Sequence, residues 1–215
     1  AFSAFAIHSS DQVAVASLST FPTHPDRFFK WFRPLAGQIF NAQPNAAHRA
    51  LAELEQTGSA QTIITQNIDM LHQKAGSKHV IEMHGTLQTL SCTRCYKKYD
   101  SADFVKKFID DETLPLCPDC SGVLKPDVIL FGEQLPQSAW FEAQSAARGC
   151  DLMVVAGSSL EVLPVAGLPM QAVDRGAHLI VINNSPTYIN VRADVVIMDD
   201  VATILPDIAK RALHG

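Results

Sequence analysis

The sequence predicts an α/β fold with a mostly parallel, buried sheet. Short apolar segments recur along the chain, most of them end at Gly, Asn or Asp, and several are followed by a helical stretch. Alternation of apolar strands with helices is typical of a parallel sheet covered by helices on both faces. The expected strands lie at 61–65, 79–83, 127–131, 151–156, 178–182 and 194–198. We therefore expect a Rossmann-like sheet with helices on both faces.

Two helical regions are expected ahead of the first of these strands. Residues 22–43 have a helical pattern and carry several aromatic side chains that supply packing area. The stretch PNAAHRALAELEQTG is a helix, because Pro44 sets the first turn, Ala and Leu repeat along one face, and Gly58 ends it. His48 and His72 lie in helical segments, and we interpret them as caps or packing groups.

Length and composition narrow the classes of function. A chain of 215 residues with 47% hydrophobic residues is an ordinary globular protein with one sizeable domain, alone or with a small module. The net charge of −5 and the lack of Lys or Arg runs argue against nucleic-acid binding. No apolar stretch approaches the roughly 18 residues that span a bilayer, and no basic lead marks a signal peptide. We expect a cytoplasmic protein with neither a membrane nor a nucleic-acid partner.

Four of the five cysteines form two tight pairs, Cys92-x-x-Cys95 and Cys117-x-x-Cys120. Each pair puts two thiolates on one turn, and two such turns complete the tetrahedron of a closed structural Zn²⁺ site. A disulfide framework is the alternative, and the reducing conditions of the cytosol disfavour it. Four thiolates leave the metal no open position, so we expect a structural zinc whose binding largely folds the module. Cys150 stands alone and is interpreted as a small buried residue.

Composition changes between residues 91 and 125, where Lys, Tyr, Asp and Pro replace the apolar strands. We expect residues 91–125 to form a zinc-ribbon module. Residues 1–90 and 126–215 should together form the Rossmann-like domain into which it is inserted. In such a domain a nucleotide binds beyond the carboxyl ends of the strands, near the switch in strand order.

Polar or small residues follow four of the expected strands, where such a ligand would bind. They are Gln66-Asn67-Ile68-Asp69, His84-Gly85, Gly157-Ser158-Ser159 and Asn183-Asn184-Ser185. Backbone N–H groups in small turns suit phosphate oxygens, and Asn after a strand suits ribose hydroxyls. Each turn alone is also explained by ordinary turn preferences. Several such turns together favour a nucleotide site.

His84 follows the expected strand at 79–83. A lone His at a strand end is often only a hydrogen-bonded structural group. Here His84 should face the same crevice as Asn67 and Asp69, where a general base would be useful. We therefore treat it as the candidate base.

The motifs together resemble the sirtuins, NAD-dependent protein lysine deacylases, and most of all the bacterial type. The segments that carry the resemblance are TQNIDMLHQKAGSKHVIEMHG, the paired C-x-x-C motifs, KPDVILFGEQLP, AGSSLEVLP and VINNSPT, within residues 18–210. The combination is specific, because other nucleotide-binding folds do not share it as a set. The resemblance implies NAD as a co-substrate, structural zinc on the four paired cysteines, and acetylated lysine peptides or proteins as partners.

The resemblance also implies roles for the polar turns. His84 would be the catalytic base that acts on the ribose hydroxyls, and Asn67 is counted with it among the catalytic residues. Asn67, Ile68 and Asp69 would line the nicotinamide pocket, with Asp69 accepting from the carboxamide, while Gln66 contacts the ribose. The other implied contacts with NAD are Gly157, Ser158, Ser159, Asn183, Asn184, Ser185 and, beside the adenine, Val201.

Two segments, VILFGE and SSLEVLP, resemble those between which sirtuins hold the substrate peptide as an added strand. This mode reads the peptide backbone and makes few side-chain demands. The implied contact residues are Ile129, Phe131, Gly132, Glu133 and Val162. Members that prefer succinyl- or malonyl-lysine have a Tyr-x-x-Arg pair where this chain has Phe32 and Leu35. Neither binds a carboxylate, so we expect acetyl-lysine.

The implied activity is NAD-dependent protein lysine deacetylation. In the sirtuin mechanism the acyl-lysine oxygen attacks the ribose carbon as nicotinamide leaves. The base-activated ribose hydroxyl then attacks the imidate, and water completes the release. The products are nicotinamide, O-acetyl-ADP-ribose and the deacetylated lysine.

One departure from the sirtuin pattern leaves an alternative open. Sirtuins begin with a strand that leads into a Gly-Ala-Gly-x-Ser loop, and this sequence has no such loop. The segment SAFAIHSS is the alternative for the strand, but it lacks the glycines that let the backbone approach a pyrophosphate. The strand is expected beside those at 61–65 and 151–156, so its absence would leave two unpaired edges. The alternative is a truncated, catalytically impaired relative that binds NAD and peptide. A dehydrogenase is disfavoured because G-x-G-x-x-G is absent, and a zinc-ribbon interaction module leaves the α/β pattern unexplained.

Overall fold

The structure is a computed structural model that describes residues 10–214. Its helices are α1 (Ser10–Val15), α2 (Pro25–Asn41), α3 (Ala46–Gln56), α4 (Leu71–Lys74), α5 (Ala102–Asp110), α6 (Gln137–Gly149), α7 (Leu168–Val173) and α8 (Val201–His214), with short 3-10 helices η1 (Val165–Gly167) and η2 (Tyr188–Arg192). Its strands are β1 (Ile63–Thr65), β2 (Val80–Glu82), β3 (Gly85–Cys92), β4 (Lys98–Asp100), β5 (Leu124–Val128), β6 (Leu152–Ala156), β7 (His178–Ile182) and β8 (Val195–Ile197).

Most of the parallel strands expected from the sequence are present, and they form two separate sheets. β1 pairs with β2 in one sheet, and β6, β7 and β8 pair in that order in the other, all in parallel. Within residues 10–214, β1 and β6 each pair with a strand on one side only. Leu152 and Val154 of β6 are 50% and 41% exposed. Among the described residues, the parallel strands therefore form two separate sheets, and β1 and β6 each have one side without a partner strand.

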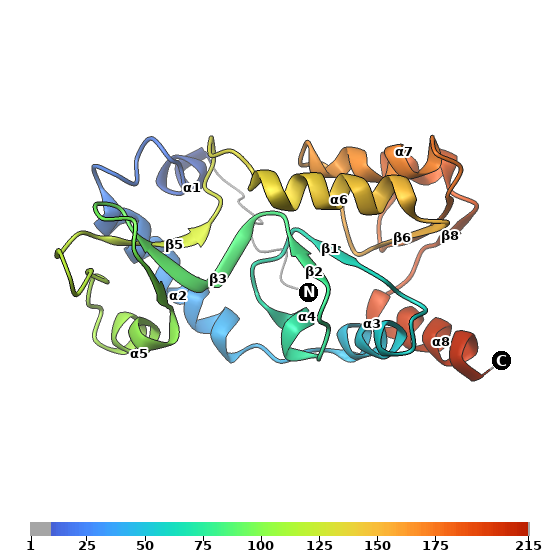
Figure 1. Cartoon of the computed structure of the whole chain (residues 1–215), viewed down its shortest axis with the longest axis horizontal. Helices are drawn as coiled ribbons and strands as arrows, with labels where there is room; N and C mark the ends of the chain where they lie inside the picture. The colour runs from blue at the N-terminus through green and yellow to red at the C-terminus, as the bar shows by residue number, and fades with distance from the viewer. Residues whose placement is uncertain (1–9, 215) are drawn as a thin grey trace.

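Helices cover both sides of these strands. Figure 1 shows α6 and α7 above the strands and α3, α4 and α8 below them. Ala143 of α6 packs in one cluster with Ile81 of β2. Leu205 of α8 packs in another with Ile182 of β7. The predicted α/β class with helices on both faces is confirmed.

The helix predicted after Pro44 is confirmed together with its cap. α3 begins at Ala46, where the His48 N–H donates to Asn45 Oδ1 at 3.1 Å and the Asn45 N–H donates to His48 Nδ1 at 3.3 Å. This reciprocal pair satisfies two of the free N–H groups of the first turn. Gly58, with φ of 79°, follows the end of the helix. His48 is thus a cap, as the sequence indicated.

An antiparallel sheet carries the cysteine pairs. β3 pairs with β4 on one side and with β5 on the other. The prediction that residues 127–131 join the parallel sheet is wrong, because the strand runs from Leu124 to Val128 and lies antiparallel to β3. Pro126 is tolerated there, since β5 is an edge strand and needs no second row of N–H donors. This sheet extends beyond both ends of residues 91–125, and the division into domains stays a prediction.

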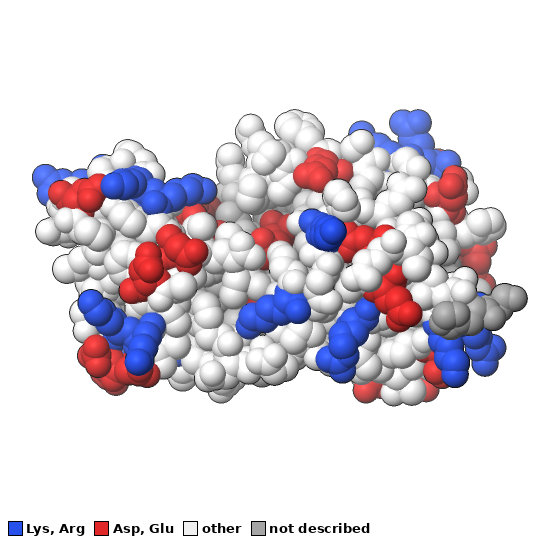
Figure 2. Space-filling view, turned by 60° about the horizontal axis from the view of Figure 1, so that its bottom comes forward, with Lys and Arg blue, Asp and Glu red and all other residues white. Residues whose placement is uncertain are grey.

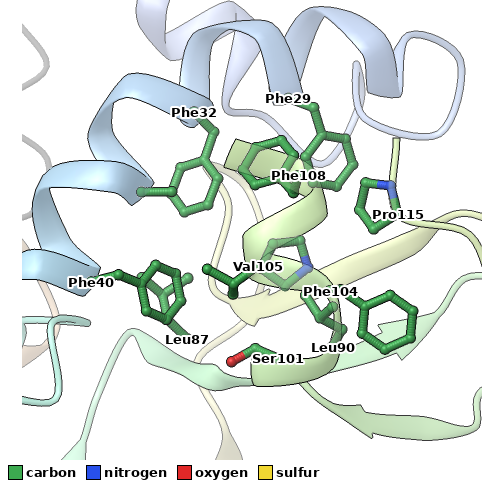
Figure 3. A pocket seen from close by; sticks show the side chains of 12 residues that line it. Phe29, Phe32, Phe40, Leu87, Leu90, Ser101, Phe104, Val105, Phe108 and Pro115 are labelled. Atoms are coloured by element: carbon green, nitrogen blue, oxygen red, sulfur yellow. The ribbon is translucent and has the colours of Figure 1, made fainter. Parts of the chain in front are cut away.

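Aromatic packing joins α5 to α2. The ring of Phe108 lies 5.2 Å from that of Phe29 and 6.3 Å from that of Phe32, measured between centroids. Below these rings, α2, α5 and the antiparallel sheet line a cavity of about 20 Å³ (Figure 3). The cavity could hold one water molecule by size, but its almost wholly apolar lining offers such a molecule no partners. We expect it to be dry.

Charges of both signs are mixed over the surface. Figure 2 shows Lys and Arg side chains interspersed with Asp and Glu over the face that it displays, with no broad area of one sign. Among the described residues, every helix is too short or too polar to cross a bilayer.

Candidate active site and metal centre

The carboxyl ends of β1 and β2 bring two of the predicted turns together. The strands pair with Thr65 opposite Glu82, and the Met83 N–H donates to the Thr65 carbonyl at 2.9 Å. Just beyond them, Nδ1 of His84 lies 3.1 Å from the carbonyl oxygen of Gln66. Neighbouring parallel strands end at the same edge, which is where such a sheet binds ligands. His84 and the turn that starts at Gln66 are therefore direct neighbours.

The bond to Gln66 sets the state of the His84 ring. A carbonyl oxygen can only accept, so Nδ1 carries the proton and Nε2 keeps its lone pair. Burial lowers the pKa of His84, and the hydrogen bond to the Gln66 carbonyl opposes that shift without cancelling it. The imidazole is therefore neutral near pH 7, with Nε2 able to accept a proton. This is the state that a general base requires.

Asp69 is almost completely buried, with 1% of its surface exposed. Its Oδ1 accepts from the N–H of Leu71, the first residue of α4, at 3.0 Å. Its Oδ2 is buried and has no hydrogen-bond partner among the described residues. An unpaired carboxylate oxygen is costly to bury. Oδ2 is therefore available to accept from an N–H group of a ligand.

Local contacts hold the turn that carries Asp69. Ile68 is fully buried in the phenylalanine-rich core, and the Asn67 N–H donates to Thr65 Oγ1 at 3.1 Å. Met70 has φ of 60°, a left-handed conformation that costs a residue with a side chain about 1 kcal/mol. Asp69 thus lies between an anchored Ile68 and a strained Met70, which limits how far its carboxylate can move.

A second group of predicted residues lies at the carboxyl ends of β6 and β7. Gly157 has φ of 61°, and a Cβ on it would lie 3.4 Å from Cγ2 of Val201 in α8. Nδ2 of Asn183 donates to the carbonyl oxygens of Ser158 at 3.2 Å and of Ser185 at 2.8 Å. These contacts join the two turns and the start of α8 into one surface.

The other two residues predicted in these turns are less constrained. Ser159 and Asn184 are exposed, and no hydrogen bond to another described residue fixes either side chain. Within residues 10–214, no hydrogen bond joins the group around Gly157 to the group around His84. Each group belongs to a different parallel sheet.

The segment after β5 is tied to the candidate base. The Ile129 N–H donates to the His84 carbonyl at 2.9 Å. Phe131 makes two backbone hydrogen bonds with residues 16–18, and its side chain is 42% exposed. Val162, 52% exposed, lies in the loop after β6, and no hydrogen bond between described residues links it to residues 129–133. The structure therefore unites His84 with one predicted substrate segment.

Three charged residues near this site were missed in the sequence. The first is Lys125, whose Nζ lies 3.0 Å from the carboxylate of Glu133, a residue that the sequence did place in the substrate site. Burial raises the pKa of Glu82 at the end of β2, and Asp127 accepts from the hydroxyl of Thr89 at 2.5 Å. The available signal was a charge inside an otherwise apolar strand, as in VIEMHG and VLKPDVILFGE.

The four paired cysteines form one cluster. The Sγ atoms of Cys92, Cys95, Cys117 and Cys120 all lie within 4.8 Å of one another. The Sγ–Sγ distances are 3.4 Å for Cys92–Cys120 and 3.7 Å for Cys95–Cys117. No disulfide joins any of the five cysteines, so the disulfide alternative is wrong.

This cluster fits a tetrahedral zinc ion. Zn–S bonds of about 2.3 Å imply S–S edges near 3.8 Å, close to the distances found. The N–H groups of Arg94 and Cys95 each lie 3.4 Å from the sulfur of Cys92. Burial alone would raise the pKa of the Cys117 thiol, but hydrogen bonds from the Tyr99 hydroxyl and two backbone N–H groups lower it to about 6. These donors favour the thiolate form of Cys117, the form that binds metal.

Comparison with known proteins agrees with these observations. The model of the Sir2 family matches residues 4–164. The chain belongs to the Sir2 family. The resemblance to sirtuins found in the sequence is thereby confirmed.

Relatives of this Sir2 protein cover most of its length. NAD-dependent protein deacylase 2 of Archaeoglobus fulgidus is 44% identical over 201 residues, which are 93% of this chain and 79% of that protein. The NAD-dependent protein deacetylase of Thermotoga maritima is 41% identical over 190 residues, 88% of this chain and 73% of that protein.

Solved structures share the fold. A structure of Sir2Tm bound to a propionylated peptide has a TM-score of 0.87 and 38% identity, covering 97% of this Sir2 protein and 87% of that chain. A Sir2 structure with a p53 peptide and NAD⁺ has a TM-score of 0.83 and 40% identity, covering 93% and 81%.

Proposed function

We propose that this Sir2 protein is an NAD-dependent protein lysine deacetylase. Its substrates are acetylated lysine peptides or proteins, and its products are nicotinamide, O-acetyl-ADP-ribose and the free lysine. Relatives are named as deacetylases and deacylases of this kind. The observation that carries the proposal is the neutral ring of His84, hydrogen-bonded to the Gln66 carbonyl at the start of the turn that also carries the buried, unpartnered Oδ2 of Asp69.

NAD, when bound, supplies the electrophilic ribose carbon and the ribose hydroxyls. Asp69 Oδ2 would accept from the nicotinamide carboxamide, next to the apolar side chain of Ile68. Gln66 and Asn67 would lie along the ribose. His84 Nε2 would take the proton of a ribose hydroxyl, because the Gln66 carbonyl keeps the other ring nitrogen protonated.

The second group of residues would hold the rest of the dinucleotide. Turns of small residues present N–H groups that suit phosphate oxygens. The proposed contacts are Gly157, Ser158, Ser159, Asn183, Asn184, Ser185 and Val201. Both N–H bonds of the Asn183 amide are already used within the chain. Its contact with a ribose hydroxyl would therefore be made through Oδ1.

The substrate peptide would dock as an added strand beside the segment after β5. The proposed contacts are Ile129, Phe131, Gly132, Glu133 and Val162. Phe32 is 2% exposed and lies among other aromatic rings, so it offers no partner for an acidic acyl chain. This favours acetyl-lysine.

The four clustered cysteines support the proposals on zinc and on the compartment. Zinc on the four cysteines would be structural, because four thiolates fill all its tetrahedral positions and leave none open for a substrate. Free thiolates persist in a reducing compartment. We infer a cytoplasmic location, with no nucleic-acid or membrane partner.

The direct test is a turnover assay. Purified, zinc-loaded protein incubated with NAD and an acetyl-lysine peptide should release one nicotinamide per acetyl group removed, measured by mass spectrometry and chromatography. The same peptide with unmodified lysine is the control. A folded protein that releases no nicotinamide would contradict the proposal.

A second candidate function is binding of NAD and peptide without efficient catalysis. It is favoured by the sides of β1 and β6 that pair with no strand among residues 10–214, and by the exposure of Leu152 and Val154 on β6. In that case calorimetry would detect saturable binding of NAD and of acetylated peptide, while the turnover assay would stay at background.

A further inference from the structure

The amine of Lys125 makes its contacts within the chain. Its side chain is only 16% exposed, although it lies on the edge strand β5. Nζ donates to the carbonyl oxygens of Val128 at 2.8 Å and Pro126 at 3.3 Å, and it lies 3.0 Å from the Glu133 carboxylate. An ammonium group has three N–H donors. All three are therefore used within the chain, and none is left for solvent or a ligand.

The Glu133 carboxylate closes a tight turn from the other end. Its Oε2 accepts from the Leu130 N–H at 2.9 Å, and the Glu133 N–H donates to the Leu130 carbonyl at 2.9 Å. Gly132, with φ of 81°, lies at the tip of this turn. Its N–H and C=O have no hydrogen-bond partner among the described residues. The turn thus presents one free pair of main-chain groups.

The opposite side of the same segment is fixed to the rest of the site. The Ile129 N–H donates to the His84 carbonyl, and Phe131 pairs its backbone with residues 16–18. Residues 129–133 are therefore held on one side by backbone bonds and on the other by the Lys125–Glu133 ion pair. The ion pair holds the carboxylate that closes the turn onto the Leu130 N–H, and so it helps to fix where the tip at Gly132 lies.

We propose that Lys125 and Glu133 form a positioning pair for the substrate peptide of the proposed deacetylase. The Lys125 amine and the Glu133 carboxylate touch neither NAD nor the acetyl group, and they hold the turn so that its free main-chain groups can pair with an incoming strand. A strand added by main-chain bonds binds more weakly if the receiving edge must first be ordered. The inference rests on the proposed function and identifies what shapes its peptide edge.

The pair should affect peptide binding and leave the NAD chemistry intact. We expect Lys125→Met to raise KM for an acetyl-lysine peptide about tenfold, with kcat and KM for NAD within about twofold of the parent. Lys125→Arg keeps a charged donor and should restore part of the loss. Glu133→Gln still accepts from Leu130 and should have a smaller effect in the same direction.

The matched control is Lys98→Met. Lys98 lies in the same antiparallel sheet, is 71% exposed and pairs with Asp127 at 3.4 Å. Removing its charge should leave KM for the peptide unchanged. Melting temperature and zinc content would be measured for every variant, and if Lys125→Met does not fold, Glu133→Gln and Lys125→Arg decide.

Binding of a fluorescent acetyl-lysine peptide gives a readout without turnover. Its dissociation constant should rise in parallel with KM for the variants of the pair. An unchanged dissociation constant, or an equal fall of kcat with all substrates, would overturn the positioning role. A parent protein that binds the peptide but does not turn over would reject the proposed activity, and the binding assay would still test the pair.

Discussion

At the scale of single residues, the chemistry depends on the protonation of His84. The pattern VIEMHG identified a candidate base at a strand end, but it could not show which ring nitrogen is free. That depends on the carbonyl of Gln66, a residue 18 positions away in the chain. The same holds for Asp69, because only the folded chain shows that Oδ1 accepts a backbone hydrogen bond and that Oδ2 has no partner among the described residues.

Replacing His84 by Ala should lower kcat about 10²- to 10⁴-fold, the usual contribution of a general base. His84 is only partly buried, so the melting temperature should change little. A nicotinamide-release assay measures the first quantity and calorimetry the second. His24→Ala removes an exposed histidine and serves as the control. Turnover of His84→Ala close to that of the parent would reject the assignment.

His72 makes stability depend on pH. Its ring lies 4.8 Å from that of His48, and burial followed by the charge of His48 lowers its pKa from 6.5 to about 4. Between these values the unfolded chain binds a proton at His72 that the folded chain does not. The free energy of unfolding therefore keeps this contribution above about pH 6.5 and loses it as the pH falls toward 4, by at most roughly 3 kcal/mol.

A His72→Phe variant keeps a ring in place and removes the titration. Urea unfolding measured from pH 7 to pH 4 should show a shallower loss of stability than in the parent. Burial also lowers the pKa values of His48 and His84, so part of the dependence should remain. A His24→Asn control should follow the parent curve. A His72→Phe curve that coincides with the parent's would show that His72 is not responsible.

At the scale of elements, apolar runs located the parallel strands well. They failed for β3, GTLQTLSC, because only Leu87, Leu90 and Cys92 of its eight residues are buried. Its polar positions gave no continuous apolar signal, and its long-range pairing with β4 and β5 is not written in local sequence. The cysteine cluster was predictable for the opposite reason, since each C-x-x-C turn is local and carries its own geometry.

Cys117→Ser should remove one zinc ligand and unfold the module around it. We expect zinc to fall well below one ion per chain and the melting temperature to drop by about 10 °C, corresponding to a few kcal/mol for a chain of this size. Metal analysis and calorimetry measure both. Cys150→Ser is the control, because Cys150 lies outside the cluster. Full zinc content in Cys117→Ser would reject the four-cysteine site.

At the scale of the whole molecule, the parallel strands form two sheets, and each sheet carries one group of the proposed site residues at its strand ends. The sequence indicated the strands and the turns that follow them. The sequence could not show whether hydrogen bonds connect the two groups of site residues. No hydrogen bond joins them among residues 10–214, so their relation depends on packing through the shared helices.

In the 215-residue chain, the side of β6 that pairs with no strand among residues 10–214 should favour self-association. Exposed Leu152 and Val154 beside unpaired backbone groups are typical of an edge that pairs with other chains. Val154→Lys should reduce the concentration-dependent increase in light scattering at least several-fold. Val191→Lys changes a valine that is 88% exposed and lies outside the sheet, and it is the control. Equal effects of both variants would show that general surface charge, and not the edge, is responsible.

β3 begins at the residue after His84 and ends at the metal ligand Cys92. A single strand of eight residues therefore links the two centres, so opening at one end has a short path to the other. Amide hydrogen exchange rates along β3 can show whether opening at the metal centre reaches the end of the strand beside His84. If chelation of zinc accelerates exchange at Leu90 but not at Gly85, the fraying stops within the ladder. If both accelerate together, the base and the metal centre belong to one cooperative unit that opens as a whole.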